Sequence, residues 1–439
     1  MAAPTSITIR MYNVGFGDCF LVTFHYAKQD RHMLIDYGST AAPKNVRGKY
    51  MTPVAKDIQK QCNGKLDILV ATHRHRDHIS GFATDGEGTG KIIASLDPDF
   101  VIQPWTEDPN AKTNALTATA SSYTKGKADA KTLTAHFLGS LEDMHRVAGM
   151  AAGLAASDPR LARSNAGKQL AFLGEDNLKN LSAVQNLMAL GKQANAFYVN
   201  AGMTLNSLLA GVKITVLGPP TLEQSEAIRK ERAKDPNEFW QFRSFWAAQG
   251  MTAENFRGAS GGTLLPHARP LRRSAYPPNA RWFIEQARRI QADQTLELVR
   301  DLDSVMNNTS VILLLEVGNR KLLFPGDAQI ENWSFALSNK KWKALLEDVN
   351  LYKVGHHGSL NATPKSLWAL FRHKGAEDAS DRLETLCSTK SGKHGSVASG
   401  TEVPRKVLVD ELKKDSQFDS TETFQAADNP CRTYTIDIH

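Results

Sequence analysis

The chain has 439 residues, of which 41% are hydrophobic and 23% are charged, which is typical of a globular protein with two or three domains, or with one large core and insertions. No apolar run reaches the roughly 18 residues of a membrane-spanning helix, and no basic segment followed by an apolar one marks a secretory signal, so we expect a cytoplasmic protein without membrane contact. Four scattered cysteines require no oxidising compartment, and a net charge of +7 favours a polyanionic partner.

The N-terminal region of the chain alternates strands and helices around a histidine-rich turn. Two glycines permit a tight turn between the first two strands. His73, His75, Asp77 and His78 follow the fourth strand directly, and a helix is expected to start after them, near Ile79. The expected strands cover residues 7–14, 19–26, 32–36, 66–71 and 100–104, and a further helix covers 54–62.

Two segments of different composition interrupt this alternation. Residues 111–204 are rich in Ala, Leu, Lys and Ser, with apolar residues at helical spacing, so we expect a helical insertion. Residues 223–302 are more polar, and we expect helices with a loop. We therefore divide the chain into a first core segment (residues 1–110), the insertion 111–204, a core strand within 205–222, the insertion 223–302 and a second core segment (residues 303–439).

The second core segment returns to strands and helices. A hairpin over 310–317 and 321–327 ends at Asp327, and a strand over 351–354 ends at the pair His356-His357. The remaining expected elements are helices over 333–346, 364–373 and 403–412, and strands over 383–387 and 431–439.

Four strand ends therefore carry residues that can hold metal ions. Imidazole nitrogens and carboxylate oxygens are ligands that zinc prefers. Within the turn, His73 and His75 can point to one side while Asp77 and His78 face a neighbouring point, which suits two metals that share a bridging hydroxide. Each segment alone is a weak signal, but the four in this order are specific: Asp36, the turn 73–78, Asp327 and the pair His356-His357.

The ordered segments resemble the metallo-β-lactamase fold superfamily, and in particular the hydrolase domain of the DNA-uptake protein ComEC and its soluble relatives. The resemblance covers roughly residues 7–108 and 212–359. It implies an α/β fold, a four-layer αβ/βα sandwich with two largely helical insertions and metals in a cleft at one sheet edge. The segments that carry it are NVGFGDCFLV, MLIDYG, ATHRHRDHISG, NNTSVILLLEVGNRKLLFPGD and LYKVGHHGS.

The resemblance also implies a set of ligands for two divalent metal ions, expected to be zinc, with manganese as the alternative. Either His356 or His357 completes the second site, and we favour His357 because the ligand in this superfamily usually precedes a glycine. Asp36 would accept a hydrogen bond from a ligand imidazole and fix its tautomer. The other implied ligands are His73 and His75 for the first metal, Asp77 and His78 for the second, and Asp327 bridging both.

One expected ligand is missing. The superfamily has a further histidine after the strand that ends near Pro104, where this chain reads QPWTEDPN. The first metal would then use Glu107, Asp108 or water. We interpret His136 and His145, which come later, as surface histidines.

These residues predict a hydrolase that uses a metal-bound hydroxide, with Asp77 essential for catalysis. Candidates to give the leaving group a proton are His356, Lys353 and His394, and Lys393 and Ser359 are candidates for substrate contact. We expect a phosphodiesterase or nuclease acting on nucleic acid, supported by the net charge and by the arginine-rich segment 269–273. The aromatic residues of 239–246 fit packing better than base stacking. The alternatives are a small-molecule hydrolase, acting on a phosphodiester, thioester, lactone or β-lactam, and a binding module with a degraded metal site.

Overall fold

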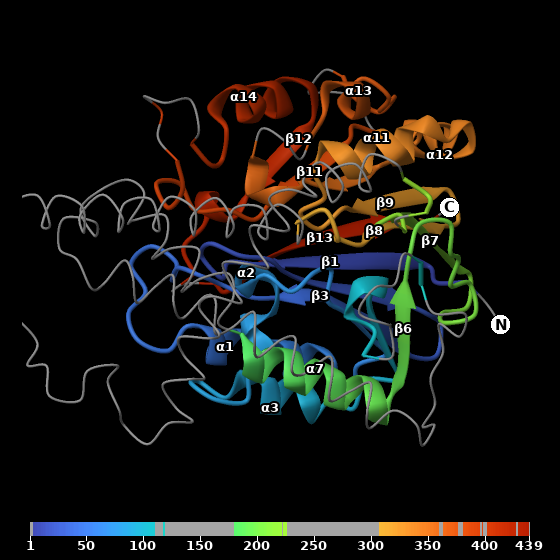
Figure 1. Cartoon of the computed structure of the whole chain (residues 1–439). Coiled ribbons are helices and arrows are strands. Elements are labelled where there is room, and N and C mark those ends of the chain that lie inside the picture. The colour runs from blue at the N-terminus through green and yellow to red at the C-terminus, as the bar shows by residue number, and fades with distance from the viewer. Residues whose placement is uncertain are drawn as a thin grey trace, which may run out of the picture.

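Two mixed β-sheets lie face to face, with helices against their outer faces (Figure 1). This computed structural model describes residues 3–109, 117–118, 180–221, 223–225, 307–359, 363–375, 381–395, 397, 402–426 and 429–438. The predicted α/β class is confirmed at the level of a mixed α/β sandwich. Within the described ranges, no helix has the length and apolar character needed to cross a membrane.

The first sheet has seven strands in the order β13-β1-β2-β3-β4-β5-β6. Neighbours from β13 to β3 are antiparallel, whereas β3, β4, β5 and β6 run parallel. The carboxyl ends of the parallel strands therefore meet at one edge, and the segments that follow β3 and β4 lie beside each other there. The strands are β1 Ser6–Tyr12, β2 Cys19–His25, β3 Asp30–Tyr37, β4 Ile68–Val70, β5 Phe100–Pro104, β6 Asn195–Val199 and β13 Cys431–Asp437.

The second sheet has six strands in the order β12-β11-β10-β9-β8-β7. Its strands β9 to β12 are parallel, so the segments after β9 and β10 also emerge at a common edge. The strands are β7 Val212–Gly218, β8 Ile312–Val317, β9 Arg320–Phe324, β10 Leu351–Lys353, β11 Glu384–Cys387 and β12 Gln417–Ser420.

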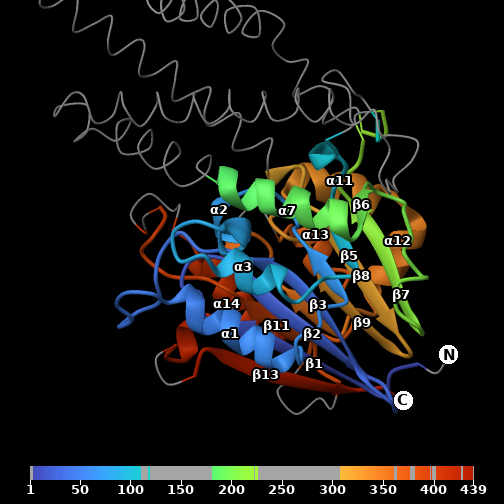
Figure 2. The ribbon, with the colours of Figure 1, turned by 90° about the horizontal axis from the view of Figure 1, so that it is seen from below.

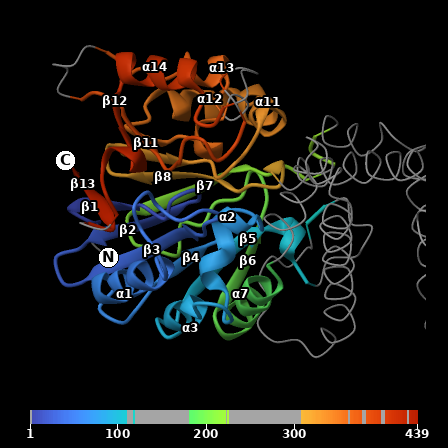
Figure 3. The same ribbon diagram turned by 90° about the vertical axis from the view of Figure 1, so that its left-hand side faces the viewer.

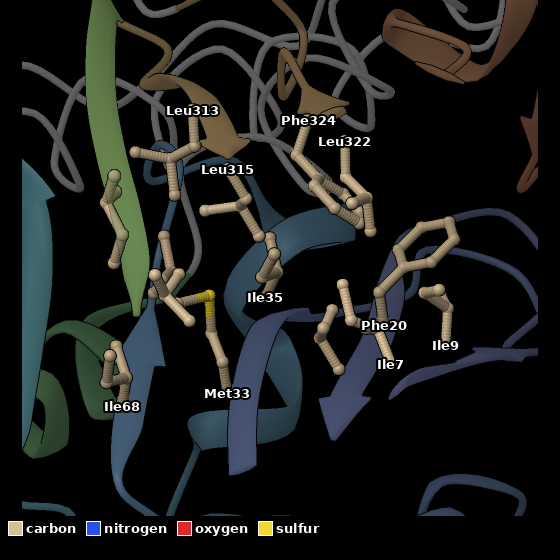
Figure 4. Packing of buried hydrophobic residues seen from close by; sticks show 14 of the residues in the cluster. Ile7, Ile9, Phe20, Met33, Ile35, Ile68, Leu313, Leu315, Leu322 and Phe324 are labelled. Carbon is tan, nitrogen blue, oxygen red and sulfur yellow. The ribbon is translucent and has the colours of Figure 1, made fainter. Parts of the chain in front are cut away.

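Apolar side chains from both sheets fill the space between them. Figure 4 shows Leu315 and Phe324 of the second sheet pointing toward Ile35 and Phe20 of the first. The rings of Phe20 and Phe324 are 5.9 Å apart and nearly edge to face, and burying each contributes about 1.5–3 kcal/mol. This core fixes the two sheets against each other, and with them the strand ends that carry the site.

Amphipathic helices cover the outer faces. In α1 the buried residues Met51, Val54, Ala55 and Ile58 follow helical spacing and pack on the first sheet. Figure 2 shows α1, α3 and α7 on this side, and Figure 3 shows α11 to α14 on the far side of the second sheet. Their bounds are α1 Met51–Gln61, α3 Thr89–Ala94, α7 Leu181–Gln193, α11 Ile330–Ser338, α12 Lys340–Glu347, α13 Lys365–Trp368 and α14 Lys406–Asp415.

Several elements differ from the sequence predictions. The helix predicted over 333–346 is two helices, because the side chain of Asn339 accepts hydrogen bonds from two backbone amides and starts α12. The helix predicted over 364–373 is limited to α13. Two strands, β6 and β12, were not predicted, and β6 lies within the range assigned to the first insertion. Most of the two insertions lies outside the described residues, so the proposed division of the chain remains a prediction.

Candidate metal centre

The histidine-rich turn leaves β4 and enters a short helix earlier than expected. His75 has an extended backbone and immediately precedes α2, which covers Arg76–Ile79, so Asp77 and His78 lie in its first turn. His73 and His75 therefore come from the extended segment and Asp77 and His78 from the helix. The change from extended to helical backbone separates the four side chains into two groups. This separation was expected from a turn alone.

Four donors from both sheets converge in one buried cluster, which we call the four-donor cluster: Asp77, His78, Asp327 and His357. Their ligand atoms all lie within 4.8 Å of one another. Nε2 of His78 lies 3.0 Å from Oδ2 of Asp327, and Nε2 of His357 lies 3.1 Å from Oδ2 of Asp77. Two donors follow β4 and two follow β9 and β10, so the cluster forms only where the edges of the two sheets meet.

Charge holds this cluster together. Burial alone would lower the pKa of His78, but the carboxylates of Asp327 and Asp36 outweigh it and hold this pKa well above the ordinary value. In the same way, Asp327 and Asp18 raise the pKa of His357 to about 10. Burial opposes ionisation of Asp327, yet the neighbouring imidazoles hold its pKa well below its ordinary value. The carboxylates therefore attract positive charge into the cluster.

Asp36 fixes the orientation of His78. Its carboxylate accepts hydrogen bonds of 2.7 Å from the backbone N of Thr72, from Oγ1 of Thr72 and from Nδ1 of His78. Because Nδ1 of His78 is engaged, its Nε2 is directed at Asp327. His357 is oriented similarly, since its Nδ1 donates to the carbonyl of Ser388 at 3.0 Å.

His73 and His75 form a second, smaller group, which we call the two-histidine pair. Their ring centroids are 4.7 Å apart, and the ring of His73 is 4.1 Å from that of His78. Burial lowers the pKa of His75 to about 4 and that of His73 well below its ordinary value, so both imidazoles are neutral, as metal ligands must be. Within the described ranges, neither ring joins a group of three donors within 4.8 Å.

Glu107 and Asp108 were the candidates to replace the missing histidine ligand. Glu107 is buried and pairs with Arg74, whose Nε and Nη2 lie 2.7 and 2.8 Å from its two carboxylate oxygens. This bidentate ion pair engages both carboxylate oxygens, so Glu107 would have to share them with Arg74 to complete the two-histidine pair. Asp108 is also buried, while His136 and His145 lie outside the described residues.

Lys353, which was predicted to be a proton donor, is buried beside the four-donor cluster. Its side chain is 2% exposed, and its ammonium pairs with Asp18, a residue of the glycine turn between β1 and β2. The segment NVGFGDCFLV contributes to the family resemblance, but Asp18 within it was not predicted to have a role. The available signal was a carboxylate directly after Gly17 in the segment GFGD, which indicates a turn but does not reveal the partner of Asp18.

The other predicted catalytic and substrate residues surround the cluster. His356 is 27% exposed, and its Nε2 is 3.9 Å from Oδ2 of Asp327. The ring of Phe16 lies between two histidines, 4.4 Å from His357 and 4.3 Å from His394. Burial lowers the pKa of His394 to about 4. Oγ of Ser359 is buried without a hydrogen-bond partner in the described regions of the chain, and Lys393 lies in the partly exposed turn beside His394.

No protein-family model matches this chain, and no curated protein matches it either. The function is therefore inferred from the residues of the site.

The buried polar atoms of the site fit a divalent cation. Among the described residues, Nε2 of His73, Oδ1 of Asp77 and Oδ1 of Asp327 are buried without a hydrogen-bond partner. Leaving such atoms unsatisfied is unfavourable. The donors are nitrogen and oxygen only, a set that suits zinc and manganese. The four-donor cluster would hold one ion, and the two-histidine pair would contribute to a second.

Proposed function

We propose that this chain is a metal-dependent hydrolase of the metallo-β-lactamase superfamily that cleaves phosphodiester bonds. The observation that carries the proposal is the four-donor cluster, in which the ordered strand-end residues Asp77, His78, Asp327 and His357 converge from two sheets. The chain supplies both metal ligands and a carboxylate that orients a ligand, which are two features common to metallohydrolases. Apart from the missing histidine, the expected donor residues are all present, which argues against a binding module with a degraded metal site.

The chemistry divides between the ion and the protein. A divalent cation held by the four-donor cluster would lower the pKa of water and would stabilise the negative charge that develops on a phosphoryl oxygen. Asp36 and the carbonyl of Ser388 keep the two imidazoles oriented, and Phe16 packs over His357 and excludes water from that side. His356 and His394 lie next to the cluster and are the candidates to pass a proton to the leaving alkoxide. Burial lowers the pKa of both imidazoles, so only their minor protonated fraction can do so at neutral pH.

Nucleic acid is the substrate class that we propose. Three features support it: the likeness of the motifs to the ComEC-type hydrolase domain, the net charge of +7 and the arginine-rich segment 269–273. Positive charge attracts the phosphate backbone irrespective of base sequence. The arginine-rich segment and the aromatic residues of 239–246 lie outside the described residues, so their contribution is a prediction from sequence.

The experiment combines metal analysis with cleavage assays. Purified protein is analysed for bound metal and incubated with labelled single- and double-stranded DNA and RNA, and with a small phosphodiester, in the presence of Zn²⁺ or Mn²⁺. We expect cleavage of polymer by the wild type and its loss, by more than about 100-fold, in Asp77→Ala, because a ligand contributes more than the 10–100-fold of an outer partner.

The matched control is Asp410→Ala, which removes an exposed carboxylate of α14 that does not belong to the four-donor cluster. It should retain wild-type metal content and rate. Cleavage of the small ester alone would point instead to a small-molecule hydrolase. Full activity in Asp77→Ala, or a wild type without bound metal, would contradict the proposal.

A further inference from the structure

A buried ion pair crosses from one sheet to the other directly behind the four-donor cluster. Asp18 belongs to the turn between β1 and β2 and is 1% exposed, while Lys353 is the last residue of β10 and its side chain is 2% exposed. Burying an ammonium group is costly unless a carboxylate and further acceptors compensate for it. Neither residue belongs to the four-donor cluster, so the free-energy cost of burying the two charges must have another reason.

Lys353 holds the segment that carries Asp327. Its ammonium donates a hydrogen bond of 3.1 Å to the carbonyl of Gly326 and lies 3.6 Å from Oδ1 of Asp327. Gly326 has a φ of +56°, a conformation that side chains rarely adopt. The ammonium therefore fixes both the backbone before Asp327 and one of its carboxylate oxygens.

The carboxylate of Asp18 lies beside the Nδ1 atoms of His357 and His78. Its Oδ1 lies 3.4 Å from Nδ1 of His357, and its Oδ2 lies 3.7 Å from Nδ1 of His78. Its backbone N donates to the carbonyl of Asp77 at 2.8 Å. One residue of the first sheet thus contacts three members of the cluster, including one from the second sheet.

The glycine turn is clamped in this position. A Cβ atom at Gly17 would lie 2.2 Å from the carbonyl oxygen of Gly38 and 2.7 Å from that of Asp77, so only glycine allows the approach. On the other side, Oγ of Ser388 donates to the carbonyl of Gly17 at 2.5 Å. The same Ser388 orients His357 through its own carbonyl. The turn is therefore wedged between the segments that follow β3 and β11.

We infer that Asp18 and Lys353 are positioning residues, a trans-sheet ion pair that keeps the donors of the two sheets at metal-binding distance. The inference rests on the proposed metal site, which it deepens. Neither side chain is required to touch the ion or the substrate. The pair acts by holding Asp327 and the backbone of Asp77 at a fixed separation, with His357 and His78 against the carboxylate of Asp18.

Lys353→Met decides between positioning and a purely electrostatic role. Methionine keeps most of the length of the side chain and removes the charge. If the pair positions the donors, Zn²⁺ binding weakens by about 10- to 100-fold, as for other outer partners of metal ligands. If Lys353 acts only through its charge, Zn²⁺ binding becomes tighter, because an ammonium 3.6 Å from Asp327 repels a second cation.

The test measures Zn²⁺ affinity by competition with a chelating dye for the wild type, Lys353→Met, Asp18→Asn and the double variant. The double variant buries no unpaired charge, so it remains informative if either single variant fails to fold. Circular dichroism and thermal unfolding report folding separately. Asp67→Asn is the control, because Asp67 is a buried carboxylate of the first sheet that pairs with Arg31, and its Zn²⁺ affinity should stay within about twofold of wild type.

The two levels of the proposal fail in different ways. A wild type that binds no Zn²⁺ overturns the proposed metal site and the positioning role together. A wild type that binds Zn²⁺, with Lys353→Met or the double variant binding it as tightly or more tightly, overturns the positioning role alone. Weaker binding in folded Lys353→Met and in the double variant, with Asp67→Asn unchanged, supports it.

Discussion

The four-donor cluster and the two-histidine pair lie next to each other but are built in different ways. The cluster draws two donors from each sheet and surrounds them with ion pairs and hydrogen bonds. The pair comes from a single extended segment after β4, and Glu107, the carboxylate that the sequence offered to it, is engaged by Arg74. Donors that come from a single segment are thus surrounded less completely than donors that converge from both sheets. The difference predicts unequal roles in metal binding.

The largest effect is expected for Asp327→Ala. Asp327 contacts His78 at 3.0 Å and His357 at 3.5 Å, so its loss removes a donor and the negative charge that gathers the imidazoles. We expect metal content and phosphodiesterase rate both to fall by more than about 100-fold. Elemental analysis and the rate on the best substrate measure this. Retained metal in Asp327→Ala would contradict the central role of Asp327 in the cluster.

A smaller effect is expected for His73→Ala. The change removes half of the two-histidine pair but leaves every member of the four-donor cluster in place. The affinity of the cluster for its ion should therefore weaken by less than about tenfold, while any second ion is lost. Metal stoichiometry measured by titration resolves the two losses. A collapse of all binding would mean that the two groups act as one unit.

The pH dependence of metal binding also differs between the two groups. At neutral pH, His357, with its pKa raised to about 10, and His78 carry protons in the metal-free protein, and both must release them to bind an ion. Loading the cluster should release about two protons. The pKa of His75 is lowered to about 4, so this ligand is already neutral.

Binding at the cluster should therefore weaken as the pH falls from about 8 to about 6, and binding at the pair should not. Calorimetric titrations in buffers of different ionisation enthalpy count the released protons. His73→Ala, in which only the cluster is intact, is the matched comparison. Proton release that is the same for both ions would contradict the assigned difference.

The sequence predicts those features that are written in local patterns. The strand over Phe100–Pro104 was predicted with the bounds that the structure has, because its apolar run is flanked by turn residues. Strand-end residues such as Asp36 and Asp327 were identified because parallel strands deliver their carboxyl ends to one edge.

Features that depend on distant partners were missed. The strand β12, QFDS, has few apolar residues and forms only because β11 is beside it. Nothing near Lys353 in the sequence indicates that its side chain is buried. The burial depends on Asp18, which is hundreds of residues away in the chain, so Lys353 was predicted to be a proton donor. A charged residue has no local signal that reports whether a counter-charge will meet it in the fold.

The pairing of β13 with β1 has a consequence for how the protein is made. Ile7 faces Ile436 across this ladder, so β1 lacks this partner until a strand much later in the chain has been synthesised. Until then, the outer edge of β1 offers unpaired amide and carbonyl groups, the kind of edge that other chains extend into aggregates. We therefore expect the chain to be more prone to aggregation before β13 has paired with β1 than after it.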